Sequence, residues 1–384
     1  MQKAIKVLYI SHFFVSSLYQ RKLIWLSKMP NLTVAGVTPK TWVDEGMVHN
    51  FEPPLENCIR IFTIRSYLTG NGSLYFLSPV SLFKIFKMFK PDIIHVDEEP
   101  WSLCMLQVLF ARGIICQQAK LIFDTSENIP KPIPFPFSII QQWTFQSACY
   151  ATAINSEAKI VLKQKGFHGP IKVVGHGVDP KFFFPDTNKQ KYRRMLELSP
   201  DDYCIGYVGI LTRRKGVQIL LNAFARLRIP NSKLILVGSG PLENEIKQRV
   251  WTDPRLKGRV ILVGSAPHVR IPDYLRCLDV LVLPSLTTPN WKEQFGRVLI
   301  EAMACGVPVI GSNSGGIPEV INDAGLIFSE GNDEELTNLL IRVFTDRELR
   351  NELIHKGLQR VSEKYTWEKI AQELYNIYAE ILHC

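Results

Sequence analysis

Short apolar runs of β-rich composition recur along the first part of this chain, with helix-forming stretches between them. The clearest are Ile5–Ile10, Asp92–Val96, Lys120–Asp124 and Ala151–Asn155. Short strands that alternate with helical segments are typical of βα units, which assemble a parallel sheet. Because the binding groups of such sheets gather at the carboxyl ends of the strands, polar residues that follow a strand are the first candidates for a functional site.

A second series of the same kind follows later in the chain. It begins at Tyr203–Val208 and repeats at Lys233–Val237, Arg259–Val263 and Val280–Ser285. The polar run Pro185–Pro200 separates the two series and is typical of a linker with an entry helix. Since 384 residues exceed what one hydrophobic core usually organises, we expect an α/β protein with two Rossmann-like domains.

The composition, with 46% hydrophobic and 21% charged residues, is that of an ordinary folded protein. The apolar run at the N-terminus is too short for a signal peptide, and no run approaches the length of a membrane span. The eight cysteines are scattered, without the spacing of metal ligands, which is typical of reduced thiols. We therefore expect a cytoplasmic protein without a metal site.

The formal net charge of +9 would suit nucleic acid, an anionic membrane surface or phosphate-bearing substrates. No nucleic-acid-binding module is present, so we expect no nucleic-acid partner. The stretch Ser81–Pro91 places Lys84, Lys87 and Lys90 on one side of a helix, with three phenylalanines between them. Such a helix can lie on a membrane, which would make the protein peripheral at the inner face; packing on the sheet, with snorkelling lysines, is the interpretation we favour.

A motif in the second series sets two carboxylates, Glu293 and Glu301, around the start of a helix that follows a strand. The helix is expected over about Arg297–Cys305, and its N-terminus offers free backbone N–H groups and the positive end of its dipole. Gly296 lets a phosphate approach the backbone closely. Carboxylates accept hydrogen bonds from sugar and ribose hydroxyls, so the motif suits a sugar nucleotide.

The block from Leu283 to Val320 resembles the donor-site signature of the retaining glycosyltransferases of family 4. It contains Glu-x7-Glu with Phe-Gly after the first Glu, then Glu-Ala-Met-Ala-Cys-Gly-Val-Pro-Val-Ile and Gly-Gly-Ile-Pro-Glu-Val. The resemblance implies the GT-B architecture, in which two Rossmann-like domains with parallel sheets face across a cleft. We expect an acceptor-binding domain over 1–184, a donor-binding domain over 185–365, and a terminal helix over 366–384 that crosses back to the first domain.

The resemblance also implies roles for the motif. The first Glu of the pair contacts the transferred sugar, the second holds the ribose, and the residues after the first meet the diphosphate through their backbone. The expected donor-binding residues are Gly209, Arg214, Lys215, Gly238, Val263, Glu293, Gln294, Phe295, Gly296, Arg297, Val298 and Glu301.

The stretch Tyr207–Gly216 is similar to the family's Gly-Arg-Leu-x-x-x-Lys-Gly element, whose Arg and Lys neutralise the donor diphosphate. Lys215 matches the Lys, but Ile210 stands where the family has Arg. We expect Arg213 or Arg214 to supply the missing charge.

In the first domain, Asp124 follows a strand near the place where many family members carry a His that contacts the donor sugar. Together with Glu293 and Lys215, Asp124 completes the expected catalytic set. Glu98, Glu127 and Asn128 are the expected acceptor-binding residues, since they also follow strands. A solvated acidic turn at Glu98 and helix capping by Asn128 remain the alternatives.

The function implied is transfer of a hexosyl group, with retention of configuration, from a nucleoside diphosphate sugar to a hydroxyl acceptor. A saccharide or lipid-linked saccharide in polysaccharide or glycolipid synthesis is the expected acceptor. The resemblance implies a reaction without a metal or other cofactor. The alternatives are an epimerase or phosphorylase on the same architecture, or a sugar-nucleotide-binding protein without turnover.

Overall fold

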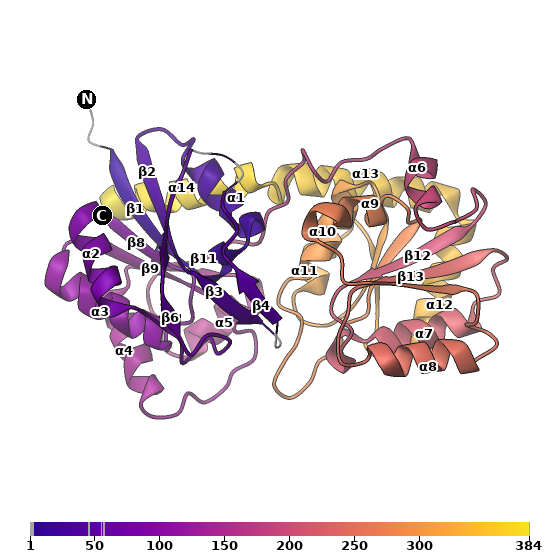
Figure 1. Ribbon diagram of the computed structural model, residues 1–384, viewed down its shortest axis with the longest axis horizontal. Helices are drawn as coiled ribbons and strands as arrows, with labels where there is room; N and C mark the ends of the chain where they lie inside the picture. The colour runs from indigo at the N-terminus through magenta and orange to yellow at the C-terminus, as the bar shows by residue number, and fades with distance from the viewer. Residues whose placement is uncertain (1–3, 45–46, 55, 57, 384) are drawn as a thin grey trace. The chain divides into compact units, whose positions relative to one another are not determined.

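The computed structural model describes residues 4–44, 47–54, 56 and 58–383. The chain divides into two compact units, one of Met1–Gly177 with Trp367–Cys384 (unit 1) and one of Val178–Thr366 (unit 2). The first part of unit 1 therefore ends at Gly177, ahead of the boundary after residue 184 that the sequence predicted. The last helix, α14 (Trp367–His383, yellow in Figure 1), belongs to unit 1.

Unit 1 is built on a seven-stranded sheet in which every pairing is parallel. In spatial order its strands are β11 (Ile171–Val173), β10 (Tyr150–Ala153), β9 (Lys120–Thr125), β8 (Ile93–Val96), β1 (Ile5–Ile10), β2 (Leu32–Pro39) and β5 (Arg60–Ile64). The chain runs outward from β1 through β2 to β5 and then returns to β8 on the other side of β1. The strand order thus reverses between β1 and β8, the place where such sheets bind ligands.

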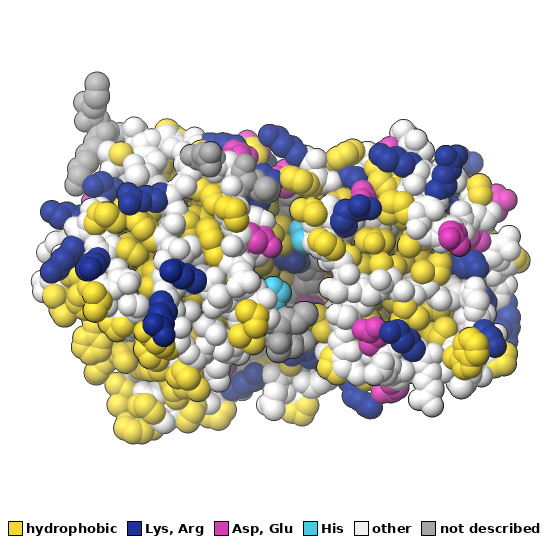
Figure 2. Space-filling view, in the orientation of Figure 1, with side chains coloured by type: hydrophobic (Ala, Val, Ile, Leu, Met, Phe, Trp, Pro, Cys, Tyr) yellow, Lys and Arg dark blue, Asp and Glu magenta, His cyan; other side chains and the backbone are white. Residues whose placement is uncertain are grey.

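Helices cover both faces of this sheet (Figure 1). They are α1 (Ser17–Leu26), α2 (Pro79–Phe89), α3 (Leu103–Ile115), α4 (Phe137–Ser147), α5 (Ser156–Gln164) and α14, with the 3₁₀ turn η1 (His12–Val15) after β1. Two antiparallel hairpins lie outside the sheet: β3 (Thr41–Asp44) with β4 (Met47–Asn50), and β6 (Ser66–Tyr67) with β7 (Phe76–Leu77). Hydrophobic side chains gather on the surface over α2, α3 and α4 (Figure 2).

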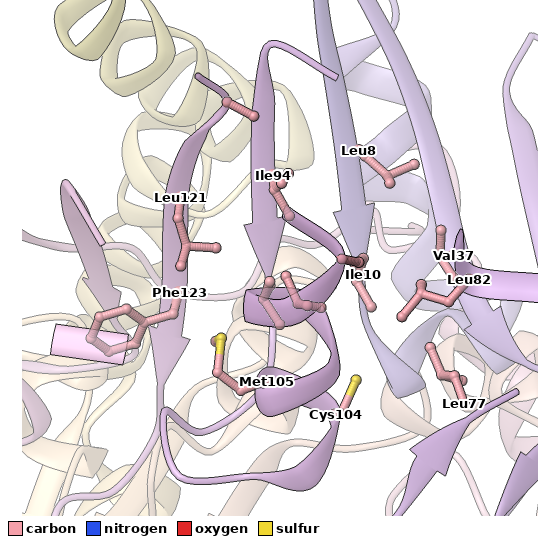
Figure 3. Close-up of a cluster of buried hydrophobic side chains, with 14 of the residues drawn as sticks. Leu8, Ile10, Val37, Leu77, Leu82, Ile94, Cys104, Met105, Leu121 and Phe123 are labelled. Carbon is pink, nitrogen blue, oxygen red and sulfur yellow. The ribbon is translucent and has the colours of Figure 1, made fainter. Parts of the chain in front are cut away.

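The side chains of successive strand residues point to alternate faces of the sheet, which divides the unit 1 core into two layers. Leu8 and Ile10 of β1 join a cluster with Ile94, Phe123 and the α3 residue Met105, whose side chains lie on one face of the sheet (Figure 3). Their neighbours in β1, Val7 and Tyr9, face the opposite side and pack with α1 and α14. A side-chain period of two residues explains this division, because successive residues of a strand point to opposite faces.

Unit 2 contains a six-stranded sheet, also parallel throughout. Its order is β14 (Val260–Gly264), β13 (Ser232–Val237), β12 (Tyr203–Val208), β15 (Val280–Leu283), β16 (Val309–Ser312) and β17 (Leu326–Phe328). The order reverses between β12 and β15. The expected α/β architecture with two Rossmann-like units is confirmed.

The helices of unit 2 follow the same alternation with the strands. They are α6 (Lys189–Arg194), α7 (Val217–Arg226), α8 (Glu243–Thr252), α9 (Ile271–Leu275), α10 (Arg297–Ala304), α11 (Ile317–Ile321), α12 (Asp333–Thr345) and α13 (Arg347–Lys364), with 3₁₀ turns η2 (Arg213–Lys215) and η3 (His268–Arg270). In α7, Val217, Leu220, Leu221 and Phe224 are buried. Their spacing of three and four residues forms one apolar stripe that faces the sheet.

None of the helices in the described part of the chain is both long and apolar enough to span a membrane. The seven cysteines within the described residues are free thiols. The eighth, Cys384, lies outside those residues.

Candidate functional site

Two loops meet at the point where the strand order of unit 2 reverses, one after β12 and one after β15. Gly216 (φ +68°) lies so close to the second loop that a Cβ atom would be 1.7 Å from the carbonyl oxygen of Pro284. The amide of Leu286 also donates a hydrogen bond of 2.7 Å to the carbonyl of Arg214. Only glycine fits this approach, and the neighbouring Lys215 is thereby held against the loop that leads to Glu293.

Glu293 is buried in this loop with only 6% of its surface exposed. Its Oε2 atom accepts hydrogen bonds from Lys215 Nζ at 2.7 Å and from Ser285 Oγ at 2.6 Å. The backbone carbonyl of Glu293 accepts a third bond, of 2.8 Å, from the amide of Gly316. The structure therefore brings together the two residues, Lys215 and Glu293, that the sequence assigned to leaving group and sugar.

The ring of Trp291 lies close to two cations of the first loop. The guanidinium of Arg214 lies 4.8 Å from the centre of its ring, and Lys215 Nζ lies 5.0 Å from it. Arg213, by contrast, points outward with a 77% exposed side chain and lies 3.5 Å from Glu245. Of the two arginines proposed to replace the charge missing at Ile210, only Arg214 shares the surroundings of Lys215.

The N-terminus of α10 lies directly after this cluster. Gly296 (φ +77°) is its N-cap residue, and no side chain caps the helix there. The side chain of Phe295 is buried edge-on against Tyr365, with ring centres 5.6 Å apart, so that Phe295 can offer a ligand only its backbone. Gln294 and Val298 are half-buried beside it. Uncapped N–H groups at a helix N-terminus attract anions.

Glu301 lies one turn into α10 and is 4% exposed. Its Oε1 atom is 2.9 Å from His268 Nε2 and 3.1 Å from Arg297 Nε. Burial raises the pKa of Glu301, but the charge of Arg297 and the hydrogen bond with His268 outweigh it and hold the pKa below its usual value. The carboxylate is thus kept ionised and oriented.

The remaining expected donor residues lie along the same edge of the sheet. Gly238, after β13, is so close to the turn after β12 that a Cβ atom would be 1.9 Å from the carbonyl oxygen of Gly209. Val263 is half-buried near the end of β14, and the next residue, Gly264, accepts a 2.8 Å bond from the amide of Gly238. The turns that end β12, β13 and β14 therefore form one continuous backbone surface.

In unit 1, Glu98 lies at the corresponding reversal point, between β1 and β8. Its Oε1 atom is bound by the amide of His12 at 3.0 Å, by His12 Nδ1 at 2.7 Å and by the hydroxyl of Tyr75. The His12 ring stacks on Trp42 with ring centres 4.1 Å apart. A buried carboxylate bounded by aromatic rings is suited to hydroxyl-bearing ligands.

Asp124 is held by its neighbours within unit 1. Its Oδ1 atom lies 2.5 Å from His95 Nε2 and accepts a bond from Thr152, while Oδ2 accepts a 3.0 Å bond from the hydroxyl of Tyr9. His95 Nδ1 in turn lies 2.7 Å from the hydroxyl of Tyr378 in α14. Burial raises the pKa of Asp124, yet the interaction with His95 outweighs it and holds the pKa below its usual value. This geometry favours a role in tying strands and α14 together over direct contact with a sugar.

The other two expected acceptor residues also have protein partners. Glu127 forms an ion pair with Lys165, whose ammonium lies 4.7 Å from the centre of the Trp101 ring. Asn128 is 5% exposed, and its Nδ2 atom is 3.4 Å from Glu157.

Sequence reasoning did not find four side chains of these sites. His12 and His268 follow strands β1 and β14, which is a signal that could have identified them. Trp42 and Trp291 carry no such signal, because their importance rests on ring contacts that only the folded chain brings about.

Glu99 provides a test of the electrostatics of unit 1. Burial raises its pKa to about 7, against opposing hydrogen bonds from Ser126 and Thr125. The folded chain therefore favours the protonated form. Relative to Glu99→Gln, the free energy of unfolding of the wild type should fall as the pH rises from 4.5 to 7. One pKa unit corresponds to about 1.4 kcal/mol, so the fall should reach about 3 kcal/mol. Urea unfolding at several pH values measures it, and a pH-independent difference would contradict the raised pKa.

Comparison with known proteins identifies the class. The sequence model of the family "Glycosyl transferases group 1" matches residues 188–360. N-acetyl-alpha-D-glucosaminyl L-malate synthase of Bacillus anthracis is 30% identical over 305 residues, 76% of this chain and 75% of that protein. The lipopolysaccharide core biosynthesis mannosyltransferase LpsB of Rhizobium meliloti is 30% identical over 313 residues, 76% of this chain and 84% of that protein. The match to the uncharacterized glycosyltransferase MJ1607 of Methanocaldococcus jannaschii, 31% identical, covers 54% of this chain and 53% of that protein.

Solved structures show the same fold over the whole chain. Sucrose-phosphate synthase (tll1590) from Thermosynechococcus elongatus has a TM-score of 0.76 and 22% identity, and covers 99% of each chain. Anabaena Alr3699/HepE in complex with UDP and glucose has a TM-score of 0.73 and 19% identity, over 98% of this chain and 99% of that one. The chain has the GT-B architecture of two Rossmann-like units. It belongs to the group 1 glycosyltransferase family.

Proposed function

We propose that the protein transfers a hexosyl group from a nucleoside diphosphate sugar to a hydroxyl acceptor with retention of configuration. The observation that carries the proposal is the ion pair between Lys215 and the buried Glu293, with Nζ and Oε2 2.7 Å apart, directly before the N-terminus of α10. A cation, a buried carboxylate and the N-terminus of a helix thus lie at one reversal point of a parallel sheet, which supports a sugar-nucleotide site there.

Each part of the donor then has a partner in unit 2. Glu293 orients the hydroxyls of the sugar, Glu301 holds the ribose, and Lys215 and Arg214 with the N-terminus of α10 bind the diphosphate. The complex of Anabaena HepE with UDP and glucose supports a donor of this class, and the mannosyltransferase named among the relatives supports transfer of a hexosyl group.

The proposed reaction needs no side chain as base. The bond between the anomeric carbon and the diphosphate oxygen breaks, and the bond to the acceptor oxygen forms on the same face of the sugar. The acceptor proton passes to an oxygen of the departing phosphate. Positive charges and N–H groups that are already in place stabilise the negative charge that develops on the leaving group.

For the acceptor, we propose a saccharide or lipid-linked saccharide bound by unit 1, in polysaccharide or glycolipid synthesis at the inner face of the membrane. The position of Glu98 at the unit 1 reversal point, with the His12 and Trp42 rings beside it, supports this assignment. The relative LpsB, which is named for lipopolysaccharide core biosynthesis, supports the acceptor class.

Incubation with a panel of nucleoside diphosphate sugars and acceptors tests the proposed function. Transfer predicts release of nucleoside diphosphate that requires an acceptor, and a product with the anomeric configuration of the donor. Release without any acceptor would indicate a hydrolase. Interconversion of the donor sugar would indicate an epimerase, and glycosyl phosphate formed from inorganic phosphate would indicate a phosphorylase.

The two neighbouring arginines give a matched prediction. Arg214→Ala should raise the KM for the donor by about tenfold, since it removes a charge beside the diphosphate. Arg213→Ala, which removes the same group from an exposed position, should leave the KM unchanged. Steady-state kinetics with varied donor measures both, and equal effects of the two variants would contradict the assignment of Arg214.

A further inference from the structure

Three neighbouring helices of unit 1 contain no acidic residue. The sequences of α2, α3 and α4 have not one Asp or Glu, whereas they include Lys84, Lys87 and Arg112, and Lys90 follows α2 directly. The helix α3 packs between α2 and α4, so the three lie side by side (Figure 1). Surface helices of soluble proteins normally mix both signs of charge.

The same helices expose large apolar side chains. These are Val80 and Met88 of α2 (66% and 55% exposed), Phe110 and Ile114 of α3 (54% and 69%), Trp143 of α4 (47%), and Phe135 just before α4 (79%). We call this set, with Lys84, Lys87 and Lys90, the α2–α4 surface. Figure 2 shows hydrophobic side chains gathered there, at the lower left, with basic side chains near them and no acidic one among them.

The core of unit 1 does not account for these exposed residues. The inner faces of the helices are already filled by other side chains, namely Leu82, Ile85 and Phe86 of α2, Cys104, Met105 and Val108 of α3, and Ile140 of α4. The exposed apolar residues therefore add nothing to that packing. A contiguous apolar patch of this kind marks an interaction site.

We propose that the α2–α4 surface binds an anionic lipid bilayer. The charge of this surface distinguishes between two possible partners, a second copy of the chain and a lipid bilayer. A second copy of the chain related by a twofold axis would bring the same lysines together, with no carboxylate on these helices to neutralise them. An anionic bilayer offers negative headgroups to Lys84, Lys87 and Lys90 and an acyl boundary to Phe110, Ile114 and Trp143.

This inference rests on the proposed function and deepens it. Binding of the α2–α4 surface to a bilayer would hold unit 1, the proposed acceptor-binding unit, at the surface where a lipid-linked acceptor lies. The residues that carry the inference all lie in unit 1, and none belongs to the donor site. A binding experiment without donor or acceptor therefore separates the two proposals, since either one can fail while the other holds.

Co-sedimentation of the full-length protein with vesicles tests the surface. The wild type should pellet with vesicles of phosphatidylglycerol and phosphatidylcholine, and increasingly so with the fraction of phosphatidylglycerol. The double variant Phe110→Ser/Ile114→Ser should bind at least about tenfold more weakly. Lys84→Gln/Lys87→Gln should lose about 30-fold, and Lys84→Arg/Lys87→Arg should retain binding.

Trp251→Ser provides the matched control. Trp251 is 72% exposed on α8 of unit 2, a helix that carries Glu243 and Glu245 in its first turn, and its loss should leave vesicle binding unchanged. A wild type that stays in the supernatant at every lipid composition would overturn the proposal. Equal binding to neutral vesicles would also overturn it. So would a wild type that is a dimer on size exclusion, if Phe110→Ser/Ile114→Ser converts it to a monomer without weakening vesicle binding.

Discussion

Glu293→Gln should lower kcat by about a thousandfold while the protein stays folded, because the neutral amide cannot hold the sugar hydroxyls as a carboxylate does. Lys215, the cation that Glu293 neutralises, retains 20% exposure of its side chain and can be solvated when the pair is broken. The melting temperature should therefore change little. Steady-state kinetics with saturating donor, together with thermal unfolding, measures the two effects.

Glu245→Gln is the control for this variant, since it makes the same chemical change at an exposed carboxylate of unit 2. Its turnover should equal that of the wild type. A turnover number for Glu293→Gln within a fewfold of the wild type would contradict the assignment of Glu293 to the donor site.

Lys215→Met should weaken the donor site and the fold together. In the proposed donor site the variant removes a cation that stabilises the leaving diphosphate, so kcat/KM should fall by about a hundredfold or more. The variant also removes the ammonium that Glu293 Oε2 binds at 2.7 Å, and losing one member of an ion pair with a buried carboxylate costs about 3 kcal/mol. Donor kinetics and urea unfolding measure the two losses.

The double variant tests whether the instability of Lys215→Met comes from the buried charge of Glu293. In the double variant Lys215→Met/Glu293→Gln the buried negative charge is removed together with the ammonium, so the free energy of unfolding should recover while activity stays low. If the double variant is as unstable as Lys215→Met, the loss comes from packing against Trp291 rather than from the charge of Glu293.

The alternation of apolar runs and helical stretches was enough to predict the strands that carry the sites. The run Tyr203–Val208 is strand β12 to the residue, and Lys120–Asp124 falls one residue short of β9. These strands lie inside parallel sheets, where both faces are covered by helices, so their sequences are largely apolar and easy to recognise. The helix predicted from Arg297 begins at that residue as α10, because the signal for its start lies in the adjacent sequence.

Contacts between distant segments could not be predicted in this way. The residues next to Asp124 in sequence do not predict its contacts with His95 and Thr152, which lie on the neighbouring strands β8 and β10. The hairpin that brings Trp42 over His12 is short and lies outside the sheets. The position of the unit boundary at Gly177 likewise depends on packing, since a Cβ atom there would lie 2.6 Å from the ring of Trp367 in α14.

At Ile210 the chain departs from the element it resembles, which has an arginine at this position. The carbonyl of Ile210 accepts a 2.7 Å bond from the hydroxyl of Tyr207, so its backbone serves to shape the turn. Arg214, four residues on, shares the Trp291 ring with Lys215. We therefore propose that Arg214 supplies the positive charge from within the same loop.

The most direct test of the account is a thermal-shift titration with UDP, GDP and ADP. Bound only by the folded protein, at least one of the three should raise the melting temperature of the wild type and of Arg213→Ala by several degrees at a hundredfold excess over its Kd. Lys215→Met should show little of this shift relative to its own baseline. No shift with any nucleoside diphosphate, or an undiminished shift in Lys215→Met, would contradict a donor site between β12 and β15.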